Sequence, residues 1–132
     1  MLAIARQRAV DLGRDVTLRE ADAEHLPFTD ASFDTVVCAL ALCTIPNPAA
    51  AVGEMRRVLV PGGRLLLLDH VGSTWPPVYA IQWLAERVTI RAAGEHFTRR
   101  QLPLVTAAGF QIQETERLKA GTVECIQAVK PA

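Results

Sequence analysis

The 132-residue sequence has no excess of charge of either sign, because 14 Lys and Arg residues balance 14 Asp and Glu residues. Proteins that bind nucleic acid usually carry a basic excess, and attraction to an anionic membrane surface also needs one. We therefore expect neither partner. Cysteine is scarce and odd in number, at Cys38, Cys43 and Cys125. This count favours a reduced, cytoplasmic protein over a disulfide framework.

Several glycine-dependent signatures are missing from the sequence. It contains no G-x-G-x-x-G motif, no Walker A loop and no G-x-S-x-G elbow. The adjacent pair Gly62-Gly63 follows a predicted helix and precedes a predicted strand. A phosphate loop needs the reverse order, because the anion sits on a helix N-terminus, so this pair predicts a turn.

Spacings typical of metal sites are missing as well. His25, His70 and His96 are far apart and have no helical i, i+4 ligand partner, and Cys38 and Cys43 are not spaced as C-x-x-C. A metal site would need long-range assembly, and none is predicted. A signal peptide is also not expected, because arginines interrupt the apolar N-terminal run.

What the sequence does contain is apolar: half of its residues are hydrophobic, enough for the core of one domain over 1–132. The charge-free stretch 35–53 is broken by Pro46, Asn47 and Pro48, which favours two short buried elements over a membrane-spanning helix. Periodicity and turn residues predict alternating elements: helices over 1–12, 49–60, around 81–88 and from a cap near Thr98 to Gly109, and strands over 16–21, 33–39, 65–68, 111–118 and 122–129. For the last helix, Thr98 and Gln101 have the spacing of a capping box, Phe97 and Leu102 that of a hydrophobic staple, and Gly109-Phe110 predicts a Schellman end. Residues 71–78 are predicted to form a loop.

This alternation indicates a parallel α/β sheet closed by an antiparallel C-terminal hairpin. Ligands of such sheets bind beyond the carboxyl ends of the strands, so residues that follow a strand are candidates for a site. Asp22 has this position, and either accepts a hydrogen bond from a ligand or caps its own turn. The same argument makes candidates of Cys43, Asp69 and His70, which also follow predicted strands. Asp34 lies at the amino end of a strand and is interpreted as a structural residue.

Several stretches together resemble one family. The run EADAEHLPFTDASFDTVVCALALCTIPNPAAAVGEMRRVLVPGGRLLLLDHV resembles the middle of class I S-adenosylmethionine-dependent methyltransferases of the ubiquinone and menaquinone biosynthesis type, and HFTRRQLPLVTAAGF resembles the end of that fold. The Leu-Cys-Thr stretch and the tryptophan-containing insert more weakly resemble thiol methyltransferase-like proteins. The resemblance implies a Rossmann-like sheet that lacks the first βαβ block, and thus an N-terminally truncated domain.

The resemblance also assigns residues. Asp22 matches the position that contacts the adenine amino group, and the backbone N–H of Ala23 the position that meets the adenine ring. Ala39 and Leu40, with Ala41, match the wall beside the methionine portion of the cofactor. The glycine-rich loop and the acidic residue for the ribose have no counterpart. No catalytic residue is assigned, because the sulfonium is already a strong electrophile and positioning carries much of the rate.

The predicted function is methyl transfer from S-adenosylmethionine to a small-molecule acceptor, impaired in this chain by the incomplete cofactor site. Whether the chain is itself an active enzyme is left open. Trp75, Tyr79 and Trp83 either form a lid over the acceptor or pack on the sheet. The alternatives are a non-catalytic binding or oligomerisation module, and a different Rossmann-like enzyme, which the missing dinucleotide motif disfavours. The incomplete sheet edge predicts a homo-oligomer or a poorly ordered N-terminus.

Overall fold

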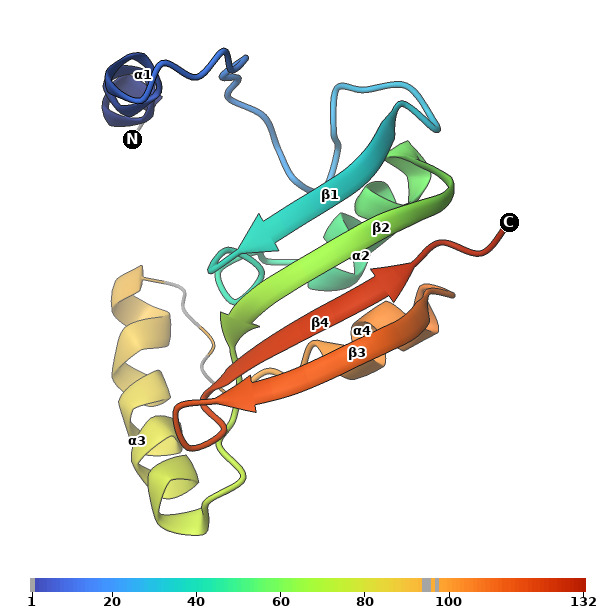
Figure 1. Cartoon of the computed structure of the whole chain (residues 1–132). Helices are drawn as coiled ribbons and strands as arrows, with labels where there is room; N and C mark the ends of the chain where they lie inside the picture. The colour runs from blue at the N-terminus through green and yellow to red at the C-terminus, as the bar shows by residue number, and fades with distance from the viewer. Residues whose placement is uncertain (1, 94–95, 97) are drawn as a thin grey trace.

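The computed structural model describes residues 2–93, 96 and 98–132. Its centre is a four-stranded sheet in the order β1-β2-β4-β3, made of β1 (Phe33–Ala39), β2 (Leu59–His70), β3 (Gln111–Leu118) and β4 (Val123–Val129). β1 and β2 are parallel, whereas β4 is antiparallel to both β2 and β3. This mixed α/β sheet with a C-terminal hairpin confirms the predicted fold class (Figure 1).

Two helices, α2 (Pro48–Val58) and α4 (Leu102–Ala107), lie on one face of the sheet (Figure 1). Asn47 caps α2, because its side-chain oxygen accepts the N–H of Ala50 at 3.1 Å. The inward face of α2 then joins side chains of β1, β2, β4 and α4 in a single apolar core: Cys38, Leu42, Ala51, Val52, Met55, Leu59, Leu65, Leu67, Val105, Phe110, Ile126 and Ala128. The core therefore lies on this face of the sheet.

β2 is much longer than the predicted strand at 65–68. It begins directly after α2 and includes the Pro61-Gly62-Gly63 turn, where Gly62 has φ +78° and the β1–β2 register shifts. The pairing with β4 runs from Arg64 opposite Val129 to His70 opposite Val123. Pairing with β4 extends the strand to His70, and its early start at Leu59 lies opposite Phe33 of β1. The residue pattern of β2 alone did not indicate this extension.

α3 (Pro76–Ala93) extends beyond the end of the sheet rather than covering a face (Figure 1). The predicted loop over 71–78 was too long, since the helix already begins at Pro76. Proline is tolerated in the first turn of a helix because those N–H groups have no helical partner. No described helix combines the length and the apolar composition that crossing a bilayer requires.

α4 ends as the sequence predicted. Phe110 N–H donates to the carbonyl of Val105 and Gly109 N–H to that of Thr106, with Gly109 at φ +84°, which is a Schellman motif. Its start differs from the prediction. Gln101 occupies the N-cap position but makes no capping bond with its side chain, so the capping box is wrong. The proposed staple involves Phe97, which lies outside the described residues.

The N-terminal segment does not join the sheet. α1 (Leu2–Asp11) has no buried residue and lies apart from the rest of the chain (Figure 1). The strand predicted over 16–21 is wrong, because these residues form no ladder and Val16 is 51% exposed. An alternating pattern makes a strand only where a neighbouring strand accepts and donates its hydrogen bonds. As a result, β1 is an edge strand.

Candidate functional site

The exit of β1 is strained and exposed. Leu40 follows the strand with φ +53°, a backbone region that residues other than glycine rarely adopt. Its N–H donates to the carbonyl of Leu68 at 2.7 Å. Its side chain is 52% exposed, and Ala39 is exposed as well. Strained backbone of this kind often marks functional sites. Ala39 and Leu40, both assigned to the methionine wall, therefore lie at the carboxyl edge of the parallel pair.

Asp22, assigned to adenine, is held in a turn of its own. Its Oδ1 accepts the N–H of Glu24 at 2.8 Å, and its Oδ2 lies 3.3 Å from Nδ1 of His25. The Glu24 N–H, and secondarily the His25 side chain, hold the pKa of Asp22 below its ordinary value. The turn-capping interpretation describes these contacts, and a ligand role for this exposed carboxylate remains a prediction.

Side chains of α2 and the backbone N–H of its N-cap residue fix the segment that carries Asp22. Glu24 accepts the backbone N–H of Asn47 at 2.8 Å, and Leu26 N–H donates to Glu54 at 2.8 Å. Arg57 donates to the carbonyls of Leu26 and Phe28 and to the carboxylates of Glu54 and Asp30. The segment is thus secured to α2 by polar contacts.

Ala23 and Ala41 both pack against the apolar core. The segment after Asp22 reaches Asn47 at the start of α2, and the loop that follows β1 ends at that same asparagine. The structure therefore brings the residues assigned to adenine and those assigned to the methionine wall to the same end of β1 and α2.

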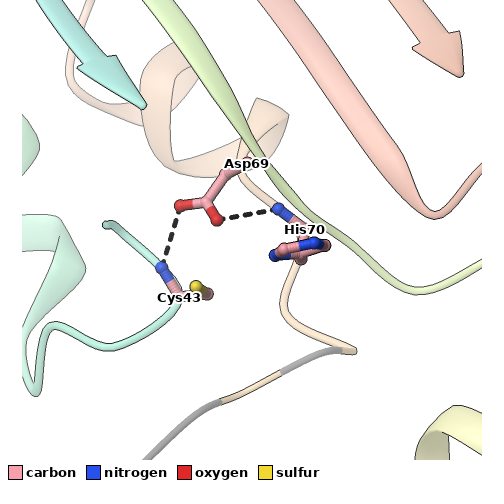
Figure 2. A group of neighbouring side chains, drawn as sticks. All are labelled: Cys43, Asp69 and His70. Atoms are coloured by element: carbon pink, nitrogen blue, oxygen red, sulfur yellow. Dashed lines mark hydrogen bonds between the residues drawn. The ribbon is translucent and has the colours of Figure 1, made fainter. Parts of the chain in front are cut away.

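A second polar group at this edge was not predicted as a cluster. The carboxylate of Asp69 accepts Cys43 N–H at 2.9 Å and His70 N–H at 2.7 Å, and joins the loop after β1 to the end of β2 (Figure 2). Burial, with a secondary effect of the Asp69 charge, raises the pKa of the Cys38 thiol. The available signal was topological: Cys43 lies just after one parallel strand, and Asp69-His70 closes the next.

The other two histidines lie elsewhere. The His25 imidazole faces Asp22, and Nδ1 of His96 is 3.3 Å from Glu86 of α3. His96 N–H donates to the Cys43 carbonyl at 3.1 Å, which links the segment after α3 to the loop after β1. Cys125 lies on β4 and is partly buried.

The three aromatic residues proposed as a lid are not buried against the sheet. Trp75, Tyr79 and Trp83 are 64%, 40% and 46% exposed. The Arg87 guanidinium lies 3.8 Å from the centroid of the Trp83 ring, a cation–π contact. A Cβ built on Gly72 would come within 3.0 Å of the Tyr79 ring, so that ring lies directly on the glycine backbone. Packing on the sheet does not account for the exposed aromatic surfaces of this segment.

Residues 1–67, just over half of the chain, match the methyltransferase domain family. The chain is 31% identical over 133 residues to the ubiquinone/menaquinone biosynthesis C-methyltransferase UbiE of Cupriavidus metallidurans, covering 94% of this chain and 54% of that protein. It spans about half or less of the length of the first curated relatives it matches.

Solved structures agree on the fold. A protein of Bacillus halodurans, provisionally assigned as a methyltransferase, superposes with a TM-score of 0.80 at 23% identity, over 99% of this chain and 79% of that one. The [4+2]-cyclase SpnF superposes with a TM-score of 0.77 at 21% identity, over 98% and 62%. Identities this low show the fold alone, and the cyclase illustrates that one fold supports more than one reaction.

The family match rests on the segment that contains Asp22, β1, α2 and most of β2. It is the same segment whose motifs carried the resemblance in the sequence, and S-adenosylmethionine is the cofactor of the family. The chain belongs to the class I S-adenosylmethionine-dependent methyltransferases.

Proposed function

We propose that this domain serves the transfer of a methyl group from S-adenosylmethionine to a small-molecule acceptor. The observation that carries the proposal, beside the family match, is the exposed and strained exit of β1 at Leu40, at the edge where open α/β sheets bind ligands. Bound there, the cofactor supplies an electrophilic methyl group. The chain's own contribution is then to orient the two reactants and exclude water.

The acceptor is proposed to be an apolar ring compound of the quinone type. Relatives such as the Cupriavidus enzyme act in ubiquinone and menaquinone biosynthesis by name. The exposed rings of Trp75, Tyr79 and Trp83 offer a flat apolar surface on the segment that follows β2. Aromatic faces stack well on planar rings, which supports a lid role for this segment.

The residues present fit only part of the cofactor. Asp22 and Ala23 would bind adenine, while Ala39 and Leu40 would line the methionine side, but no residue replaces the glycine-rich loop or the ribose carboxylate. A net hydrogen bond contributes about 1 kcal/mol, whereas association costs roughly 4 kcal/mol or more in lost freedom. Both carboxylate oxygens of Asp22 also contact groups of the chain itself. The isolated chain should therefore bind S-adenosylmethionine weakly or not at all.

Calorimetric titration with S-adenosylhomocysteine tests both proposals. The 132-residue chain should give no measurable heat of binding, whereas a version extended upstream to the length of the relatives should bind. Asp22→Ala in the extended protein should weaken binding several-fold, and Glu116→Ala on β3 should not.

Two results would contradict these proposals in different ways. Absence of binding by both proteins would remove the methyltransferase proposal. A low-micromolar dissociation constant for the 132-residue chain, lost in Asp22→Ala, would remove the proposed impairment.

A second candidate function is a non-catalytic binding or oligomerisation module. The open edge of β1 favours it, because an edge strand is a template for pairing with another chain. This candidate predicts self-association without cofactor binding, even in the extended protein. Activity of the extended protein toward a demethylated quinone would exclude it.

A further inference from the structure

Three side chains of metal-binding type converge where β1 and β2 end. Cys43 comes from the loop after β1, and Asp69 and His70 are the last residues of β2. One ligand atom from each, the thiol sulfur, a carboxylate oxygen and an imidazole nitrogen, lies within 4.8 Å of the other two. Cys43 is 3% and Asp69 1% exposed, while His70 is half-buried, so the group faces solvent on one side only.

We propose that Cys43, Asp69 and His70 bind a single divalent transition-metal ion of the zinc class. Thiolate, imidazole and carboxylate together are the donor set that zinc accepts, whereas magnesium and calcium require oxygen ligands alone. Three protein ligands also correspond to an open zinc site, in which water or another small ligand takes the fourth position.

The existing geometry is close to what such an ion needs. Metal–ligand bonds of roughly 2.0–2.3 Å place tetrahedral ligand atoms about 3.3–3.6 Å apart. From the 4.8 Å limit, the ligand atoms therefore have to approach one another by about 1.2–1.5 Å at most. Rotation of the half-buried His70 side chain would bring its imidazole closer to the other two ligands.

The hydrogen bonds of Asp69 are compatible with a ligand role. Each carboxylate oxygen has two lone pairs, and the N–H groups of Cys43 and His70 use only one on each oxygen. Carboxylates that bind metals are usually oriented by further hydrogen bonds of this kind. Here the two donors belong to the other two ligand residues, so the same contacts that hold Asp69 also position Cys43 and His70 (Figure 2).

Charge supports the proposal independently. Asp69 is almost completely buried, yet within the described parts of the chain no lysine or arginine forms an ion pair with it. Removing a carboxylate from water without a counter-charge is costly. A divalent cation would neutralise both Asp69 and the Cys43 thiolate that it generates on binding. The proposal does not depend on cofactor binding, because its residues differ from those assigned to S-adenosylmethionine.

Cobalt titration of the tag-free, metal-depleted chain tests this site. Co²⁺ should bind one to one, give thiolate charge-transfer absorption in the near ultraviolet, and be displaced by Zn²⁺. Cys43→Ser should abolish this absorption, and His70→Gln should weaken binding at least about tenfold, since even outer-shell changes cost that much. Cys125→Ser, which removes a partly buried thiol on β4, is the matched control and should bind as the unmodified chain does.

Far-ultraviolet circular dichroism shows whether each variant keeps its fold. His70→Gln should perturb the fold less than Cys43→Ser, because the His70 side chain is only half-buried. The proposal is overturned if the folded chain gives no thiolate–cobalt absorption. It is equally overturned if that absorption survives in Cys43→Ser, or if Zn²⁺ binds His70→Gln as tightly as it binds the unmodified chain.

Discussion

At the residue scale, Glu54 of α2 binds both a loop backbone group and the side chain of Arg57. Its carboxylate accepts two hydrogen bonds from Arg57, which chiefly lower its pKa from 4.5 to about 2, and the N–H of Leu26 adds to the effect. Arg57 in turn reaches the carbonyl of Phe28. The Glu54–Arg57 ion pair is therefore one of the contacts that hold the loop from Asp22 to β1, and its contribution to stability should depend on pH.

Glu54→Gln should destabilise the chain by about 1–3 kcal/mol at neutral pH, the usual contribution of hydrogen bonds to a charged group. A folded-state pKa below the unfolded value means that the stabilisation is fully present above pH 4.5 and is lost as the pH falls toward about 2. The difference in urea midpoint between Glu54→Gln and the unmodified chain should shrink over that window. Glu116→Gln, on the exposed side of β3, should show no such window, and an equal pH dependence in both variants would contradict the assignment to Glu54.

At the element scale, the junction of α2 and β2 depends on the Pro61-Gly62-Gly63 turn. Gly62 N–H donates to the carbonyl of Lys130, and Lys130 N–H donates to that of Gly63, both at 2.9 Å. These bonds connect the start of the long strand to the residue after β4. A sequence motif that indicates only a turn thus also positions the C-terminal end of the chain.

Gly63→Ala should destabilise the chain by about 1–3 kcal/mol, the typical cost of overpacking. A Cβ there would lie 2.8 Å from the Val60 carbonyl oxygen and 3.2 Å from that of Asp34, and backbone cannot yield as a flexible side chain does. Gly53→Ala is the matched control in the interior of α2, where a Cβ meets nothing within 4 Å. This substitution should stabilise the chain by about 0.5–1 kcal/mol, because alanine favours a helix over glycine. Urea unfolding measures both changes, and similar midpoints for the two variants would contradict this account.

At the scale of the whole molecule, the sheet is open on one edge. Among the described residues β1 pairs with β2 alone, and Val37 on that strand is 66% exposed. A hollow lined by apolar side chains such as Phe28, Phe33 and Val36 lies beside it. Parallel sheets of this class are usually covered on both faces and paired on all but short edges. This surface is where we expect a further strand, from a second copy or from an upstream segment.

We therefore expect the 132-residue chain to self-associate through β1. Val37→Lys should weaken association at least tenfold, because a lysine on an edge strand disfavours pairing with another chain. Sedimentation over a range of concentrations measures this, with Gln113→Lys on the opposite edge strand β3 as the control. A monomer at every concentration, combined with slow amide exchange over 16–21, would count against this prediction.

The sequence by itself determined the parts of the protein that depend on neighbours along the chain. The helix α2, the Schellman end at Gly109 and the hairpin of β3 and β4 follow from periodicity, caps and turn residues within a few positions. Asp22, Ala23, Ala39 and Leu40 were assigned to the cofactor through the resemblance to the methyltransferase family, and their role in binding is still a prediction. Only the tertiary structure decided the rest. Residues 16–21 alternate as a strand does but find no strand partner among the described residues, whereas pairing with β1 and β4 lengthened β2. Cys43 and Asp69 meet across 26 positions because two parallel strands end at the same edge, a juxtaposition that no local pattern records.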